Sequence, residues 1–275
     1  MNPFVLENPR STTRQRMRQS LSEASWAQNA IFVRELRDTV SSHPVARHPA
    51  MQVLSSGTLS LDKMRVIHLE YRHAIVQIFT DALLMAQFQT RQLEPRLSPG
   101  SKMDGRALLT LNDLDEFGFV PGTGDAGGYL GNSARAHYPL FERVLDQYGV
   151  DQPIRHRFRP SLISTRVREY LEARYPSLVS LSALLAVAEQ EVILFSPRLR
   201  QATAALGIDV TTGYYHQHGT SDDKCTEAAD DDHEDDFWWL TIQAVTEADY
   251  DCVRREVVEY CGLWEQFWSY QLARE

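Results

Sequence analysis

Cysteine is scarce in this sequence, where Cys225, Cys252 and Cys261 are the only three thiols among 275 residues. Three scattered thiols do not make a disulfide framework, so we expect a reducing compartment. Long apolar runs are missing too, since no stretch approaches the ~20 residues that a membrane span needs. The N-terminus also lacks the apolar region of a secretory signal. We therefore predict a cytoplasmic protein without a membrane partner.

The sequence also lacks an excess of positive charge. Lys and Arg number 28 against 37 Asp and Glu, which leaves a formal charge of -9. Because phosphate binding requires a basic surface, this balance excludes a nucleic-acid partner. Several arginines do gather near the N-terminus among polar residues, and we interpret residues 1–19 as a flexible polar arm. The remaining residues 20–275 are apolar enough to bury one core, so we expect a single domain there.

Period-two alternation, the sign of half-buried strands, is missing as well, and helical spacing takes its place. Connections between the helical segments are mostly short, which is typical of a bundle. We predict an all-α fold with about seven to nine helices. A glycine-rich insertion, residues 118–132, lacks the lysine of a phosphate-binding loop and is expected to be a surface insertion or lid. The longer helices are expected over Ser20–Val40, Leu61–Gln89, Gly105–Phe117, Ser133–Tyr148, Ser161–Ala173, Ser177–Ala205 and Glu247–Leu272.

What the sequence does have is a concentration of imidazole and carboxylate between Tyr214 and Leu240. This stretch holds His216, His218, His233 and a run of acids. Oxygen and nitrogen ligands at such density suit a first-row metal such as iron or manganese. The alternative is a solvated acidic loop that leads into an amphipathic helix.

Further candidate ligands lie on otherwise apolar faces of three predicted helices, at Glu116, His137 and Glu189. A buried carboxylate is costly unless a cation pairs with it. An arginine or tyrosine partner explains one such residue. Several of them, together with His218 and the acids after it, are better explained by metal, and bundle cores hold di-iron carboxylate sites of this composition.

The order of these groups resembles a known family. Asn-x-x-Asp-Glu (112–116), a later His137 before Leu-Phe, the helical Glu189 and Tyr-Tyr-x-x-His-x-x-x-Asp (214–222) follow one another. This order is similar to that of the haem-oxygenase-like di-iron oxidases, which are related in fold to pyrroloquinoline-quinone synthase and thiaminase II. The resemblance covers roughly residues 43–273 and implies a haem-oxygenase-like helical bundle.

Carried over by position, the resemblance implies the metal ligands Glu116, His137, Glu189, His218 and Asp222. The family closes this set with His-x-x-x-Asp-x-x-His, but Cys225 stands where the last histidine is expected. Asp230-x-x-His233 restores the Asp-x-x-His spacing after an insertion. We therefore predict His233 as a ligand, while the aspartate remains open between Asp222 and Asp230.

Glu70 and His73 form a Glu-x-x-His pair on the predicted helix Leu61–Gln89. This spacing occurs in di-iron bundles. We predict that the pair contributes to catalysis by contacting the metal ligands or the substrate. A histidine that is simply satisfied within the core is the alternative.

The resemblance implies a non-haem di-iron oxidase or oxygenase with two Fe(II) ions and O2 as co-substrate. Its small-molecule substrate is an amino acid, a fatty acid or an amine, and the reaction is desaturation, C–C cleavage or N-oxygenation. Arg72, Arg155 or Arg157 could anchor a substrate carboxylate. The alternatives are a metal-free oxidase similar to pyrroloquinoline-quinone synthase and a non-catalytic helical binding protein. A homodimer is considered by analogy with related folds.

Overall fold

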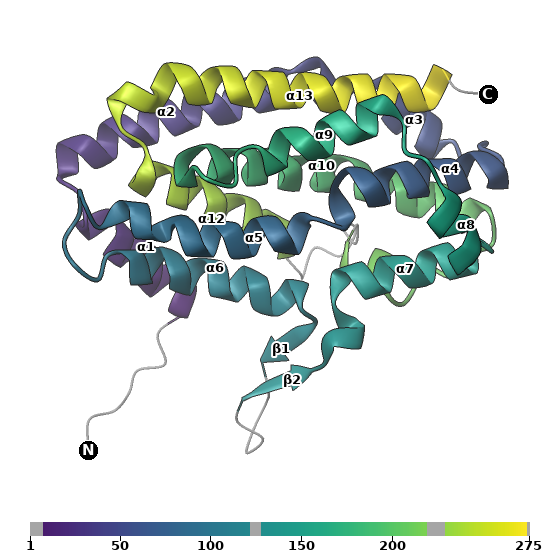
Figure 1. Cartoon of the computed structure of the whole chain (residues 1–275), viewed down its shortest axis with the longest axis horizontal. Helices are drawn as coiled ribbons and strands as arrows, with labels where there is room; N and C mark the ends of the chain where they lie inside the picture. The colour runs from purple at the N-terminus through teal and green to yellow at the C-terminus, as the bar shows by residue number, and fades with distance from the viewer. Residues whose placement is uncertain (1–7, 122–127, 219–228, 274–275) are drawn as a thin grey trace.

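The computed structural model describes residues 8–121, 128–218 and 229–273. They form a layered bundle of helices with one small hairpin at its lower edge (Figure 1). The predicted all-α class is confirmed. Short helices between the long ones raise the number above the seven to nine expected. The helices are α1 (Pro9–Gln19), α2 (Glu23–Ser42), α3 (Pro49–Ser55), α4 (Leu61–Tyr71), α5 (Phe79–Gln89), α6 (Lys102–Glu116), α7 (His137–Gln147), α8 (Gln152–Arg157), α9 (Leu162–Glu172), α10 (Leu178–Ala205), α11 (Tyr214–Gln217), α12 (Ala229–Ala244) and α13 (Tyr250–Ala273).

Serine side chains begin four of the long helices. Ser22, Ser60, Ser161 and Ser177 each accept a hydrogen bond from the backbone N–H three residues later. A serine at this position satisfies one of the helix's unpaired N–H groups, which stabilises the first turn by about 1 kcal/mol. The capping serines therefore set the starts of α2, α4, α9 and α10.

Helix α10 runs through the middle of the bundle and packs against α3, α5, α12 and α13 (Figure 1). Its central residues, from Leu181 to Ala188, are almost fully buried. By length and composition alone α10 could span a membrane, and it is the one helix of the described residues that could. However, 78% of its most apolar window is buried within the protein, as expected for the central helix of a bundle.

The long helix expected over Leu61–Gln89 is interrupted. α4 ends at Tyr71, a π-helical turn spans Arg72–Val76, and α5 begins at Phe79. The backbone N–H of Gln77 donates to the carbonyl of Arg72, five residues earlier. Such wide turns are uncommon and often lie at functional sites. Here the turn buries Ile75 and Val76, two consecutive residues, on the inner side of the bundle.

Residues 1–19 were predicted to be a flexible arm, but residues 9–19 form helix α1. Asn8 caps this helix, and Met17 is fully buried. α1 packs against α6 and α12. It is ordered because its arginines have acidic partners on those two helices, which lie far away in sequence. Residues 1–7 of the expected arm lie outside the described residues.

The glycine-rich insertion contains the hairpin, an exception to the all-helical expectation. Strands β1 (Phe119–Pro121) and β2 (Tyr129–Gly131) pair antiparallel, with Val120 opposite Leu130. The hairpin extends below α6 and α7 (Figure 1). Val120 and Leu130 are 45% and 49% exposed, so the hairpin presents apolar side chains beside the bundle rather than inside it.

Glu70 holds two elements of the bundle together. Its carboxylate is fully buried and accepts hydrogen bonds from the Ser161 backbone N–H at 3.0 Å, from the Ser161 hydroxyl at 2.9 Å and from the Ser164 hydroxyl. It thereby binds the N-terminus of α9, where the helix dipole favours a negative charge.

This arrangement predicts a stability defect for Glu70→Ala. Loss of the carboxylate removes three hydrogen bonds to a charged acceptor, one of them from the fully buried Ser164 hydroxyl, which we expect to lower the free energy of unfolding by about 3 kcal/mol. Urea denaturation measures the change. Asp62→Ala is the matched control on the same helix, because the Asp62 side chain is 87% exposed and its loss should cost less than about 1 kcal/mol.

A second carboxylate, Glu191, lies in the core on α10. Tyr71 and Trp268 donate hydrogen bonds to its two oxygens at 2.8 and 2.9 Å. Burial raises the pKa of Glu191 to about 8, although both hydrogen bonds favour the ionised form. Glu191 is therefore neutral in the folded protein at pH values where it is ionised in the unfolded chain.

Glu191 should make stability depend on pH. A carboxyl whose pKa is raised on folding contributes stability at low pH, and the contribution is lost as the pH rises toward about 8. Between about pH 5.5 and 7.5, the unfolding free energy of Glu191→Gln should fall less steeply than that of the wild type, by about 1.4 kcal/mol per pH unit. Denaturation at a series of pH values tests this. Parallel curves would mean that Glu191 is ionised in the folded protein.

Candidate metal centre

Five of the predicted ligands come together inside the bundle, each from a different segment. Glu116 is the last residue of α6, and His137 is the first of α7. Glu189 lies in the middle of α10, His218 directly follows α11, and His233 lies in the second turn of α12. All five are buried, with at most 5% of any of them exposed. The fold thus collects into one place groups that are more than a hundred residues apart in sequence.

The five residues form two groups that share Glu116. Glu116, His137 and His218 each offer a nitrogen or oxygen atom within 4.8 Å of the others, and so do Glu116, Glu189 and His233. Within the first group, Glu116 Oε1 and His218 Nε2 each lie 3.0 Å from His137 Nδ1. Within the second, His233 Nδ1 lies 3.4 Å from Glu189 Oε1. The shared carboxylate is therefore placed between two potential ion positions.

Asp115 also belongs to this site, although the sequence did not single it out. Its Oδ2 lies 3.5 Å from Nε2 of His233 and 4.0 Å from Nε2 of His137. These are the outer nitrogens of the two rings, whereas the inner nitrogens face Glu116 and Glu189. A carboxylate on the outer nitrogen orients a metal-binding imidazole. Asp115 is part of the Asn-x-x-Asp-Glu segment, which was the available signal.

The electrostatics reflect two carboxylates that share a buried space. Burial alone would raise the pKa of Glu116, but the neighbouring His137, His218 and His233 outweigh it and lower that pKa. Burial alone would lower the pKa of His233, yet Glu189, Glu116 and Asp115 raise it to about 9. In the metal-free protein the negative charge is thus balanced in part by a proton on His233.

A small cavity adjoins the two groups. Its volume is about 30 Å³, comparable to the space of one water molecule in the liquid. The π-helical turn supplies much of the apolar wall through Ile75 and Val76. The cavity is lined by Tyr71, Ile75, Val76, Phe79, Thr80, Glu116, His137, Tyr138, Glu189, Val192, Tyr214 and His218.

A wider groove approaches the same groups from outside. Its volume is about 630 Å³, and Asp115 and His233 are among the residues that line it. Leu111 and Leu114 of α6 and Phe119 of β1 give it largely apolar walls. The candidate centre therefore adjoins both a small cavity and a wider groove.

The remaining predicted site residues do not join this cluster. Neither Glu70 nor His73 lines the cavity or the groove. Glu70 binds the start of α9, and His73 Nε2 lies 3.4 Å from the Thr165 hydroxyl. Both side chains therefore contact the start or first turn of α9, and their predicted catalytic role stays a prediction. Asp222 lies outside the described residues, and so does the side chain of Asp230, so the choice between them stays open.

Two of the three arginines suggested as substrate anchors have protein partners, and the third, Arg157, is exposed. Arg72 pairs with Glu142 and donates to the Tyr138 hydroxyl. Arg155 is buried and pairs with both Glu142 and Asp146. Their charges are thereby used to join the π-helical turn, α7 and α8.

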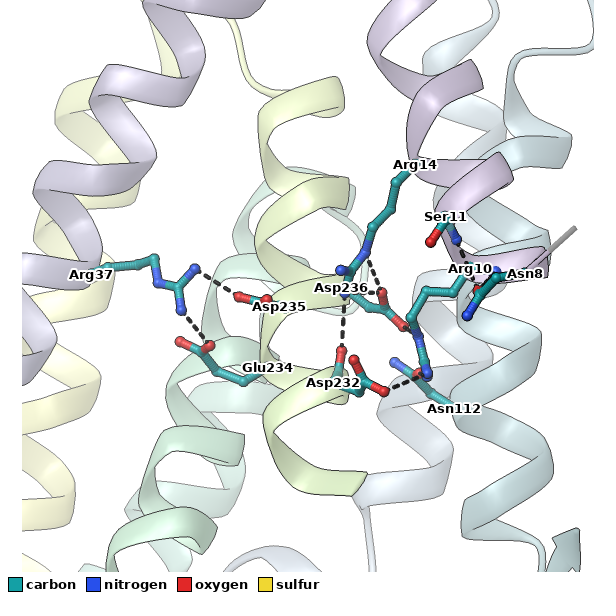
Figure 2. Close-up of polar contacts among 10 residues, drawn as sticks. All are labelled: Asn8, Arg10, Ser11, Arg14, Arg37, Asn112, Asp232, Glu234, Asp235 and Asp236. Atoms are coloured by element: carbon teal, nitrogen blue, oxygen red, sulfur yellow. Dashed lines mark hydrogen bonds and ion pairs between the residues drawn. The ribbon is translucent and has the colours of Figure 1, made fainter. Parts of the chain in front are cut away.

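The acids between Tyr214 and Leu240 were expected to bind a metal or to be solvated. Those whose side chains the structure describes pair with arginines instead. Figure 2 shows α12 between the arginines of two helices, with Arg37 of α2 on one side and Arg10 and Arg14 of α1 on the other. Of the described acids, Glu234 and Asp235 bind Arg37, while Asp232 and Asp236 bind the arginines of α1. Within residues 232–236, the side chain that contacts the cluster is His233.

Comparisons with known proteins bear on the fold. No protein-family model matches the chain, and no curated protein matches it in sequence. Among solved structures, a TenA homologue from Pseudomonas syringae pv. tomato str. DC3000 is 14% identical with a TM-score of 0.62, over 90% of this chain and 93% of that one. A TenA family transcription regulator from Silicibacter sp. TM1040 is 12% identical with a TM-score of 0.54, over 97% of each chain.

At these identities the similarity establishes the fold and not the activity. The two solved structures belong to TenA proteins, which share one all-helical architecture with thiaminase II. The predicted haem-oxygenase-like fold is thereby supported, and the chain has that fold.

Proposed function

We propose that this protein is a non-haem di-iron enzyme that uses O2 to oxidise a small substrate. The observation that carries the proposal is the arrangement of two ligand groups around one carboxylate. Glu116 belongs to both groups, and every member is buried. Buried carboxylates and imidazoles from several helices are the ligand set of di-iron sites in helical bundles.

The residues fit a pair of divalent cations. His233 Nδ1 is buried and faces Glu189 Oε1 at 3.4 Å, without the geometry of a hydrogen bond. His137 Nδ1 and His218 Nε2 face each other at 3.0 Å, so only one of the two nitrogens carries the proton between them. A cation would use both lone pairs and would replace the proton on His233. Oxygen and imidazole donors suit iron, and the set lacks the thiolates that select softer metals.

Each residue then has a definite task. Glu116, His137 and His218 would hold one ion, and Glu116, Glu189 and His233 the other. Two Fe(II) ions would supply the electrons that reduce O2. Asp115 orients the rings of His137 and His233 from their outer nitrogens, and the apolar wall of the small cavity excludes water from the site.

The sizes of the two hollows assign them different tasks. The 30 Å³ cavity suits a molecule as small as O2. The 630 Å³ groove is in the range of small-molecule sites and is lined in part by Asp115 and His233. We infer that the substrate enters through the groove. Its apolar walls favour a substrate with an apolar portion, whether an amine, an amino acid or a fatty acid.

Metal stoichiometry tests the proposal directly. Anaerobic reconstitution with Fe(II) should give close to two ions per chain. His218→Ala should reduce this to about one, because Glu116 and His137 alone would hold the first ion only weakly. His216→Ala is the matched control two residues away, since His216 is exposed and should retain both ions.

Oxygen uptake by the iron-loaded protein distinguishes the remaining functions. We expect consumption of O2 by the wild type and by His216→Ala, and little by His218→Ala. Uptake that is independent of added iron and insensitive to a chelator would favour a metal-free oxidase. A wild-type protein that binds no iron would overturn the proposal.

Metal binding should also release protons. Because the pKa of His233 is raised to about 9, its ring is protonated near neutral pH and must lose the proton to bind a metal. At about pH 7.5, Fe(II) loading should therefore release close to one proton from this residue. Anaerobic calorimetry in buffers of different ionisation enthalpy measures the number. His233→Gln should release about one proton fewer, and an unchanged number would exclude His233 as the source.

A further inference from the structure

The feature that the proposed function leaves unexplained is the link between the N-terminal helix and α12. α12 begins at Ala229, so His233 lies in its second turn. Helix ends open readily unless side chains or packing hold them. Ion pairs from α1 bind α12 at Asp232, the residue before His233, and at Asp236, three residues after it. Figure 2 shows both aspartates facing the arginines of α1.

The tightest of these contacts is at Asp236, whose side chain is fully buried. Arg10 Nε donates to one carboxylate oxygen at 2.7 Å, and Arg14 donates to the other from Nη2 at 2.6 Å and from Nε at 3.0 Å. Charge-assisted bonds to both oxygens fix the orientation of the carboxylate as well as its position. Asp236 is three residues after His233, on the adjacent turn of α12.

A second set of contacts extends the link to α6. Arg10 Nη1 binds Asp232, the residue before His233, at 2.8 Å. Its Nη2 donates to Asn112 Oδ1 at 3.3 Å. Asn112 lies one helical turn before Glu116. A single guanidinium therefore connects the helix that carries Glu116 with the helix that carries His233.

We infer that Arg10 and Arg14 are positioning residues for the ion site formed by Glu116, Glu189 and His233. This inference rests on the proposed function. The two arginines contact neither ion position themselves. They fix the turn of α12 that presents His233, and Arg10 sets its spacing from Glu116. The other ion site, which His137 and His218 complete from α7 and α11, does not depend on α12.

The double variant Arg10→Ala/Arg14→Ala tests the inference, with Co(II) as the metal probe. Equilibrium dialysis should give close to two ions per chain for the wild type and close to one for the variant. Where the second ion is still measurable, its affinity should be at least about tenfold weaker, the usual cost of losing a group that orients a ligand. Absorption bands of bound Co(II) report which site is filled, independently of activity.

Arg16→Ala is the matched control. Arg16 lies on the same helix but pairs with Asp104 of α6 rather than with α12. It should retain both ions. Equal loss of metal in Arg16→Ala would mean that α1 acts only through general stability, which would overturn the inference.

Two further variants keep the test informative if the double alanine variant does not fold. Arg10→Lys/Arg14→Lys retains the charges without the paired geometry and should weaken the second ion less than the alanine variant. Asp232→Asn removes one half-exposed partner of Arg10 and should weaken the second ion alone. Two ions of unchanged affinity in all of these variants would overturn the inference, whereas a wild type that binds no Co(II) and no Fe(II) would overturn the proposed function itself.

Discussion

The structure of the site depends on one buried carboxylate, that of Glu116, and on the need to balance its charge. Glu116 and Glu189 lie in the same dry interior, where an unpaired negative charge is very costly. Three imidazoles surround the two acids, and the proton held by His233 compensates part of their charge. Residues from five segments are thus brought together by a requirement that no single helix can meet. A cation meets the same requirement more fully than a proton does.

The helices themselves were largely predictable from sequence, because their determinants are local. Apolar residues at helical spacing indicate α2, α9 and α10 within a few residues of their observed bounds. The interruption after Tyr71 was not predictable, since a π-helical turn leaves no periodicity of its own. Helix α1 was missed for a different reason. Its sequence is mostly polar, and its arginines pair with acids that lie far away in sequence, such as Asp236, more than two hundred residues later.

The residues of the candidate site also divide into those that the sequence indicates and those that only the packing reveals. Glu116, His137, Glu189, His218 and His233 were identified through their order along the chain, and the fold brings them together. Their role as ligands remains a prediction. The catalytic role of Glu70 also remains a prediction, while its observed partner is the N-terminus of a helix almost a hundred residues later, which residue spacing does not reveal. Asp115 was overlooked because its importance lies in the direction it faces, toward the outer nitrogens of two histidines. Direction of this kind is a property of packing and not of residue spacing.

The fold leaves chemistry open, since the solved structures that share this architecture are only 14% and 12% identical to this chain. The distinguishing feature of this chain is how it surrounds its acidic centre. On one side, Ile75 and Val76 line a small cavity. On the other side, α1, α6 and the hairpin border a groove about twenty times larger. We propose that this asymmetry separates the approach of a diatomic gas from that of an organic substrate. Because α1 both lines the groove through Arg10 and pairs with α12, which carries His233, one structural element contacts the groove and the helix of a candidate ligand.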